Sequence, residues 1–390
     1  MIYFDNGATT FPKPRAVVRA ADSALTSFGA NPGRGGHKMA LRASSAVFEC
    51  RKNAARLFGL DKPESIIFMP NCTAALNTVI KGVLKSGDHA VISSLEHNAV
   101  ARPVEYMRSQ GVSCSVADFV YGDDEATVDN FRRAFRSNTR LVVCTHASNV
   151  FGVRLPAEKI AALCRLYNIL FCVDAAQTAG LVPVNMAADG IDFLCAAGHK
   201  GLYGPMGTGI LAINSPVLPR ELTQGGTGSA SASLEQPSLL PDRYESGTPN
   251  LSGIAGLNEG IKFVVSRGEE RLLQREIALA QKMYDGLSQI NGVCLYTERP
   301  AQKTHVPVVS FNIGEHDSEE VAALLDERFN IAVRAGLHCA PMAHGFFGTR
   351  EQGTVRAVIS AFNTVGEVDC FVKSVNKITK LLNKKVAIHT

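Results

Sequence analysis

The sequence predicts an α/β protein built on a largely parallel sheet that carries helices on both faces. Two observations lead to this fold class. Short apolar runs alternate with amphipathic helical stretches through most of the first two-thirds of the chain, and this alternation is typical of parallel sheets covered by helices. After about residue 252 the helical stretches lengthen and strand-like runs become fewer, which predicts a second, smaller α+β domain.

The predicted strands of the larger domain are apolar runs of strand length. They lie at Ser65–Met69, His89–Ser93, Arg140–Thr145, Ile169–Asp174, Asp192–Ala196 and Gly207–Ile213. The helical patterns around them cover Lys38–Phe58, Thr73–Leu84, Ala126–Arg136 and Ala157–Tyr167. In the last third of the chain we expect helices at Gly253–Val265, Glu269–Leu287, Ser318–Arg328 and Glu367–Asn383, with strands at Val306–Ile313 and Ile331–Arg334. The first six residues are expected to form a short strand that enters a turn.

The composition is that of a globular protein, because 46% of the 390 residues are hydrophobic and 19% are charged. This length is a prior for two or three domains. A net charge of +4 is too small to indicate a nucleic-acid or membrane partner. The lysines of the last predicted helix lie opposite an apolar face, which favours a solvated surface over a nucleic-acid stripe. They are Lys373, Lys377, Lys380 and Lys384.

Ten cysteines are spread along the chain without a Cys-x-x-Cys pair. No apolar run approaches the ~18 residues of a membrane-spanning helix, and the first residues lack the regions of a signal peptide. We therefore expect a soluble cytoplasmic protein whose thiols are reduced. Several cysteines, such as Cys144 and Cys172, lie within apolar strand-like runs, where a free cysteine packs as a small hydrophobic residue. A reactive thiol must be identified by its neighbours.

Two glycine-rich segments give little support to a nucleotide site. The stretch from Gly204 to Gly209 fits Gly-x-x-Gly-x-Gly and precedes a strand, whereas a dinucleotide-binding fingerprint has the form Gly-x-Gly-x-x-Gly and opens a helix. The segment 225–231 has the composition of a flexible loop. It is either a surface connection or a mobile loop at an active site.

Polar side chains follow several of the predicted strands at the point where each strand ends. Lys200 lies in a glycine-flanked loop, Asp174 closes a strand, His97 follows another, and Cys72 and Thr73 open a helix. Taken singly, a lysine at such a place is usually solvated and an aspartate commonly caps the next helix. Together, at the edge where parallel strands end, they offer an amine, a carboxylate, an imidazole and an anion-binding helix start. Pyridoxal phosphate (PLP) needs this set of groups.

The sequence resembles the fold-type I, class V PLP enzymes of the cysteine desulfurase and selenocysteine lyase family, and its SUF-type branch most of all. The resemblance covers essentially the whole chain. The blocks that carry it are Glu96-His97-Asn98, Thr145-His146-Ala147-Ser148-Asn149, Asp174-Ala175-Ala176-Gln177, Gly198-His199-Lys200, Glu245-Ser246-Gly247-Thr248-Pro249-Asn250 and Arg334-Ala335-Gly336-Leu337-His338-Cys339-Ala340. The family fold implies a large domain, residues 15–255, with a mostly parallel seven-stranded sheet. It also implies a small α+β domain, residues 1–14 plus 256–390, that carries Cys339 and Arg356.

The resemblance assigns most of the matching residues to the cofactor. Lys200 would hold PLP as a Schiff base and later move a proton, and Asp174 would pair with the pyridinium nitrogen. Gln177 would hydrogen-bond the phenolic oxygen, and His97 would stack on the ring as a further catalytic residue. The residues implied to hold the phosphate are Thr73 with the helix start at Cys72, His199, and Thr248 of the neighbouring subunit. A homodimer is therefore part of the prediction.

The remaining residues are assigned to the substrate. Arg356 would clamp the substrate carboxylate with help from Asn149, and Arg34 matches a block that lines the substrate entrance. Cys339 would attack the sulfur of L-cysteine, which leaves L-alanine and a persulfide that passes to a sulfur-acceptor protein. Arg334 and His338 are expected to favour its thiolate.

Two features depart from the family pattern. Ala197 stands where the family often has a hydroxyl on the PLP phosphate, which is expected to weaken binding by about 1 kcal/mol. The stretch 341–354 resembles less characterised relatives, and it leaves selenocysteine open as the substrate. A class V transaminase, β-lyase or epimerase in which Cys339 is incidental is the second hypothesis. A degenerate PLP fold that serves as a scaffold is the third, and the intact Lys200, Asp174, Gln177 and Arg356 argue against it.

Overall fold

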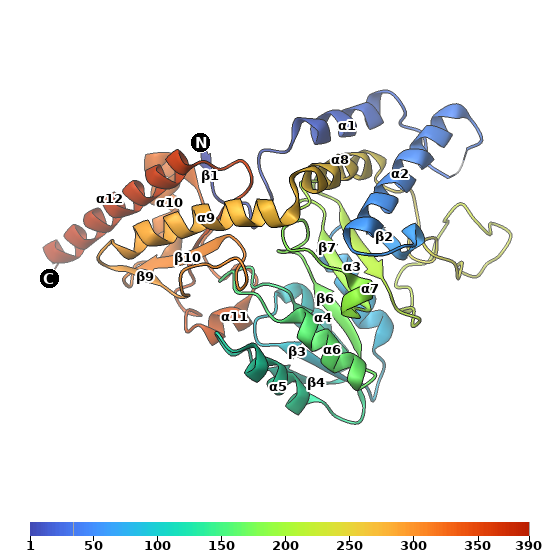
Figure 1. Cartoon of the computed structure of the whole chain (residues 1–390), viewed down its shortest axis with the longest axis horizontal. Coiled ribbons are helices and arrows are strands. Elements are labelled where there is room, and N and C mark those ends of the chain that lie inside the picture. The colour runs from blue at the N-terminus through green and yellow to red at the C-terminus, as the bar shows by residue number, and fades with distance from the viewer. Residues whose placement is uncertain (34, 390) are drawn as a thin grey trace.

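A seven-stranded sheet forms the centre of the larger part of the molecule (Figure 1). The computed structural model describes residues 1–33 and 35–389, with side chains up to residue 384. The strand order is β2-β8-β7-β6-β5-β3-β4. The strands are β2 (Ile66–Met69), β3 (His89–Ser93), β4 (Ser113–Ala117), β5 (Thr139–Thr145), β6 (Leu170–Asp174), β7 (Phe193–Ala197) and β8 (Gly209–Ile213). Because β8 is antiparallel to both of its neighbours and the other pairings are parallel, the predicted fold class is confirmed.

Helices cover both faces of this sheet, as the alternation of the sequence predicts. Strand β5 shows the cause, because successive side chains of a strand point to opposite faces. Leu141 and Val143 pack under α3 (Cys72–Val83) and α4 (Asn98–Ser109), whereas Val142 and Cys144 belong to the core on the other face. Helices that contribute to this other core include α2 (Lys38–Leu57), α5 (Asp124–Ala134), α6 (Ala157–Leu166), α7 (Met186–Asp189) and α8 (Leu251–Arg267).

The C-terminal third forms a hydrophobic core of its own together with the first residues of the chain. Strands β9 (Val293–Leu295), β10 (Val308–Ile313) and β12 (Val355–Val358) make an antiparallel sheet in the order β12-β10-β9. Strand β1 (Ile2–Tyr3) pairs in parallel with β11 (Ile331–Ala332). The helices here are α9 (Glu269–Ser288), α10 (Ser318–Phe329), α11 (Pro341–Phe346) and α12 (Val365–His389). Figure 1 shows α9 running from α8 towards β9 and β10. The domain limits given above stay a prediction.

Several elements are absent from the sequence-based assignment. Helix α4 contains Pro103, a residue that normally ends a helix, and the edge strand β4 is mostly half-buried, so neither has a clear apolar signature. Helix α1 (Arg15–Thr26) packs on α2 and α8 through small residues such as Ala24. On α12 the lysines predicted to be solvated are exposed, and the apolar residues opposite them are buried.

No helix in the described parts of the chain is both long enough and apolar enough to cross a membrane. The glycine-rich segment 225–231 is mostly exposed, as expected of a surface connection. It belongs to the stretch 214–250, to which the structure assigns neither helix nor strand.

A buried ion pair fastens this irregular stretch to the sheet domain. Arg51 of α2 donates to both carboxylate oxygens of Glu245 at 2.7 Å, and the backbone N–H of Phe68 donates to the same carboxylate. The side chains of Arg51 and Glu245 are only 6% and 14% exposed. Breaking a buried pair costs several kcal/mol because the remaining charge stays desolvated.

We therefore expect Glu245→Gln to destabilise the protein by about 3 kcal/mol, which in a chain of this size lowers Tm by about 5 °C. Thermal unfolding followed by circular dichroism measures the change. Lys159→Ala, which breaks the exposed pairs with Asp124 and Glu125, is the control and is expected to leave Tm nearly unchanged. Equal shifts in the two variants would show that Glu245 does not fasten the stretch.

Candidate active site

Lys200 lies in a tight loop just beyond the end of β7. Two glycines make the loop possible, because a Cβ on Gly198 would lie 2.3 Å from the Thr208 hydroxyl and one on Gly201 would lie 2.4 Å from the carbonyl oxygen of Ala179. Within the described residues, the Lys200 Nζ has no hydrogen-bond or ion-pair partner. The amine is therefore free for covalent chemistry.

The surroundings of Lys200 disfavour its charged form. Burial lowers the pKa of Lys200, the positive charges of Arg356 and Arg334 lower it further, and Asp174 opposes the shift. A lysine with a lowered pKa has more unprotonated amine at neutral pH, which is the form that attacks carbonyl groups.

Asp174 is the last residue of β6, and the neighbouring elements fix its carboxylate. Its Oδ1 accepts the backbone N–H of Ala176 at 2.9 Å and the thiol of Cys72 at 3.5 Å. Burial raises the pKa of the Cys72 thiol well above its usual value, and Asp174 adds to the rise. Cys72 thus stays protonated and acts as a donor to Asp174.

The start of α3 and His199 are the groups expected to hold the phosphate. Asn71 caps the helix by accepting the N–H of Ala74 at 2.9 Å, and Thr73 is exposed in the first turn, where backbone N–H groups attract anions. Burial, together with the charges of Lys200 and Lys13, lowers the pKa of His199 to about 4. His199 is therefore neutral at pH 7, and its buried Nδ1 has no partner.

His97 lies after β3 and caps α4. Its Nδ1 accepts the backbone N–H of Ala99 at 2.9 Å, which assigns the remaining ring proton to Nε2. Burial lowers the pKa of His97, with Asp174 opposing the shift and Lys200 adding to it. A neutral, half-buried ring of this kind is suited to stacking on an aromatic ligand.

Glu96 is a site residue to which the sequence assigns no role. It is fully buried, and its Oε1 accepts the backbone N–H of Thr145 at 2.8 Å and the hydroxyl of Ser93. Burial raises the pKa of Glu96 to about 8. Because Thr145 ends β5 and His97 follows Glu96 directly, this carboxyl group ties the His97 loop to the sheet. Glu96 could have been identified from the sequence, because it precedes His97 in the block Glu96-His97-Asn98 that the chain shares with the family.

Gln177 and Thr248 are the two remaining residues expected to bind the cofactor. Gln177, just after β6, donates from Nε2 to the carbonyl oxygen of Gly7 at 3.2 Å. Thr248 is exposed, accepts a long bond of 3.4 Å from Asn31, and lines a surface pocket of about 410 Å³ together with Thr78 of α3.

Arg356 comes from β12 and is only 1% exposed. Its Nη2 forms an ion pair with Asp5 at 3.0 Å, and its Nη1 donates to the carbonyl oxygen of Asn149 at 2.8 Å. Burial lowers the pKa of Arg356, and Asp5 opposes the shift. Its Nε is buried without a partner, so part of the guanidinium remains available to a ligand. Arg34, the other arginine assigned to the substrate, lies outside the described residues.

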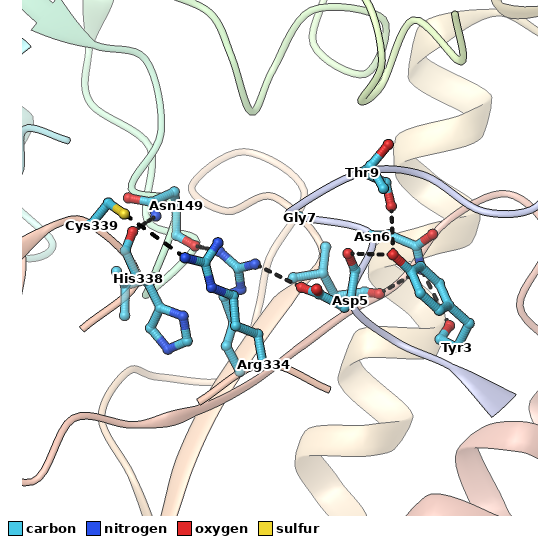
Figure 2. Close-up of polar contacts among 12 residues, drawn as sticks. Tyr3, Asp5, Asn6, Gly7, Thr9, Asn149, Arg334, His338 and Cys339 are labelled. Carbon is cyan, nitrogen blue, oxygen red and sulfur yellow. Dashed lines mark hydrogen bonds and ion pairs between the residues drawn. The ribbon is translucent and has the colours of Figure 1, made fainter. Parts of the chain in front are cut away.

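Cys339 is exposed at the edge of this network (Figure 2). The loop that carries it is unusual, because His338 and Cys339 both adopt positive φ angles, +49° and +57°. Such left-handed conformations are strained for non-glycine residues and are often found at functional sites. Asn149 holds the carbonyl oxygen of His338 at 2.9 Å, and the N–H of Asn98 holds that of Cys339 at 2.7 Å.

Two residues are expected to favour the Cys339 thiolate, Arg334 and His338. Of the two, the structure places only Arg334 in contact with the sulfur. Arg334 donates to the Cys339 sulfur at 3.8 Å, as expected of a cation beside a nucleophile. The expectation for His338 is wrong. Its Nε2 forms a hydrogen bond with the carbonyl oxygen of Thr354 at 3.0 Å, and its ring stacks on that of His344. Burial lowers the pKa of His338 to about 2. His338 is neutral and positions the loop.

The other cysteines are mostly structural, as expected. Six are buried: Cys50, Cys72, Cys144, Cys164, Cys172 and Cys195. Cys114 is half-buried, and Cys294 and Cys370 are exposed away from the site. Burial raises the pKa of Cys50 and Cys144, which makes these thiols unreactive. Cys339 is the described cysteine that combines exposure with an arginine at its sulfur.

Residues 2–371 match the family described as aminotransferase class-V. The chain belongs to the aminotransferase class-V family. Its relatives in this family include a protein of Methanothermobacter thermautotrophicus named probable cysteine desulfurase, which is 33% identical over 97% of this chain and 94% of its own length. The cysteine desulfurase of Salmonella dublin is 32% identical over 98% of this chain and 94% of its own length.

Solved structures of cysteine desulfurases also match this chain over nearly its whole length. The apo structure of a cysteine desulfurase from Thermococcus onnurineus superposes with a TM-score of 0.89 at 34% identity, over 97% of this chain and 94% of that one. The cysteine desulfurase CsdA of Escherichia coli, in its S-sulfonic acid form, gives a TM-score of 0.87 at 25% identity, over the same shares. The class V assignment is thus confirmed, and the SUF-type branch stays a prediction.

Class V enzymes depend in general on PLP, and the residues present fit this cofactor. Within the part of the chain that the structure describes, two groups that this cofactor would engage have no hydrogen-bond partner: the Nζ of Lys200 and the buried Nδ1 of His199. Ala197 is buried on β7 and supplies no hydroxyl, so this position departs from the family pattern as described above.

The lowered pKa of Lys200 predicts its labelling behaviour in the apoprotein. Acetic anhydride modifies only unprotonated amines, so the modification of Lys200 is expected to reach its midpoint at a lower pH than that of Lys377, which is exposed on α12. Peptide mass spectrometry across a pH series gives both midpoints. Because Asp174 raises the pKa of Lys200, Asp174→Asn is expected to move the Lys200 midpoint still lower. A Lys200 midpoint at or above that of Lys377 would contradict the assignment.

Proposed function

We propose that this protein is a PLP-dependent cysteine desulfurase that converts L-cysteine to L-alanine and carries the sulfur as a persulfide on Cys339. One observation carries the proposal. The Cys339 loop is hydrogen-bonded to Asn98, the neighbour of the candidate ring-stacking residue His97, so an exposed thiol adjoins the Lys200 site. Relatives named cysteine desulfurase that match over nearly the full chain support it.

Bound PLP supplies an electron sink that takes up the electron pair of the substrate bond being broken. The chain's own residues hold and orient it. Lys200 carries it covalently when no substrate is bound and then moves a proton at the substrate carbon. Asp174, fixed by Cys72 and Ala176, keeps the ring nitrogen protonated. Thr73 at the start of α3 and the neutral His199 hold the phosphate.

Sulfur transfer is assigned to the other side of the site. Arg356 holds the substrate carboxylate through its unpaired donors, with Asn149 beside it. The Cys339 thiolate attacks the substrate sulfur, so that an S–S bond forms as the C–S bond breaks, and alanine leaves after its carbon has gained a proton. Because Cys339 is exposed, a thiol of an acceptor protein can then take the sulfur by the same exchange. Selenocysteine offers the same geometry to Cys339.

Exposure of the protein to L-cysteine is expected to add the mass of one sulfur atom to Cys339. Peptide mass spectrometry detects it. Cys339→Ser is expected to lose the adduct and to lower alanine formation at least about 100-fold, because the nucleophile is gone. Cys294→Ser and Cys370→Ser remove the other exposed thiols and serve as matched controls that keep full activity. Alanine and sulfide production at the wild-type rate in Cys339→Ser would instead favour a lyase that does not use this thiol.

We propose further that the active protein is a homodimer in which Thr248 reaches the phosphate bound by the partner subunit. The exposure of Thr248 and the pocket it lines beside α3 support this. Sedimentation is expected to give twice the mass of one chain. Thr248→Val is expected to weaken PLP binding about fivefold, the effect of one lost hydrogen bond, without changing the mass. Thr223→Val, which changes another residue of the same pocket, is the control. A monomer that binds PLP at full strength would contradict the proposal.

A further inference from the structure

The segment from Tyr3 to Lys13, which we call the N-terminal strap, connects the two halves of the candidate site. At one end Asp5 pairs with Arg356 at 3.0 Å. At the other end Thr10 donates to the carbonyl oxygen of Lys200 at 3.0 Å, and Lys13 donates to that of His199 at 2.7 Å. The strap thus contacts the candidate carboxylate clamp and the loop of the candidate catalytic lysine.

Arg356 needs a counter-ion because it is buried among other cations. Its side chain is 1% exposed. Arg334 and Lys200 lie close enough to repel its positive charge electrostatically. Asp5 forms the ion pair with Arg356, and its side chain is 23% exposed. A buried cation that loses its only paired carboxylate is strongly destabilised. Asp5 therefore offsets part of the cost of burying the Arg356 charge.

The strap also fixes the direction of the guanidinium. Arg356 has five N–H donors: one at Nη2 binds Asp5 and one at Nη1 binds the Asn149 carbonyl oxygen, while Nε is unpaired. The backbone of Gly7 lies close to the group, since a Cβ there would be 3.0 Å from its Cζ. Figure 2 shows Asp5 and Gly7 opposite Asn149 and Cys339. The contacts with Asp5 and Asn149 hold the guanidinium in one orientation and leave its other donors without a partner among the contacts described.

We propose that Asp5 is a positioning residue for substrate binding: it stays bound to Nη2 and presents the unpaired donors of Arg356 to the α-carboxylate of the amino-acid substrate. The proposal rests on the proposed function, because it assigns the substrate carboxylate to Arg356. It makes the selection of α-carboxylates depend on a residue that does not touch the substrate.

Steady-state kinetics with L-cysteine test this role. Asp5→Asn keeps an oxygen acceptor but removes the charge, and we expect KM to rise about tenfold while kcat changes less than about threefold. Asp5→Glu restores the charge and is expected to bring KM part of the way back. Tyr3→Phe is the matched control: it removes the hydroxyl bonds to the carbonyl oxygens of Asp5 and Thr9 but leaves the ion pair, so KM is expected to stay within about twofold.

Binding measurements separate this proposal from the proposed function. Calorimetry with L-alanine and with L-alaninamide, which lacks the carboxylate, is expected to show a preference for L-alanine in the wild type that Asp5→Asn loses. A wild type that prefers L-alanine but releases no sulfur from L-cysteine would refute the desulfurase and leave the role of Asp5 standing.

Two results would overturn the role of Asp5. An unchanged or lower KM in Asp5→Asn would show that Asp5 does not position Arg356 or that it competes with the substrate. A fall in kcat alone would place its effect at Lys200. If Asp5→Asn does not fold, Gly7→Ala takes its place, because the added methyl group would crowd the same guanidinium together with the side chain of Val358. This variant is expected to raise KM in the same way.

Discussion

The structure of this site depends on how buried positive charge is balanced. Parallel strands bring Lys200 and Asp174 to one edge of the sheet, and the C-terminal sheet adds Arg334 and Arg356. Desolvation makes each of these cations costly. Asp174 opposes the cost at Lys200, and Asp5 opposes it at Arg356. The positive charge that remains unbalanced suits ligands that bring their own anions, a phosphate and a carboxylate.

The two halves of the site are held together by backbone contacts as much as by side chains. The Cys339 loop belongs to the C-terminal third, yet the carbonyl oxygens of His338 and Cys339 accept bonds from Asn149 and Asn98 of the sheet domain. These bonds hold the strained left-handed residues in place. The candidate nucleophile Cys339 is therefore positioned by contacts between the two halves, and its side chain is left exposed.

Much of the sheet edge could be predicted from the sequence. Lys200, Asp174 and His97 each follow a strand recognisable from its apolar run, and the polarity of a parallel sheet brings such ends together. Arg356 could not be placed in this way, because β12 has only four residues with an arginine among them. It entered through family resemblance alone.

The site features that the sequence analysis missed or misassigned depend on contacts that form only in three dimensions. His338 lies beside Cys339 in the sequence, but its backbone conformation turns the ring towards Thr354, and sequence proximity cannot reveal this. The position of Thr248 relative to a phosphate depends on a second chain. Asp5 has no sequence signal for its role, because its partner Arg356 is 351 residues away.

That separation has a consequence for the order in which the protein is made. Strands β2 to β8 end at Ile213, so the sheet domain can begin to fold during translation. Ile2 and Tyr3 must wait for their partners Ile331 and Ala332, and Asp5 for Arg356. At roughly 5–20 residues per second, synthesis of the about 145 residues between Ile213 and Val358 takes roughly 7–30 s. During that interval the nascent chain holds all the strands of the large sheet while the carboxylate pocket is unfinished.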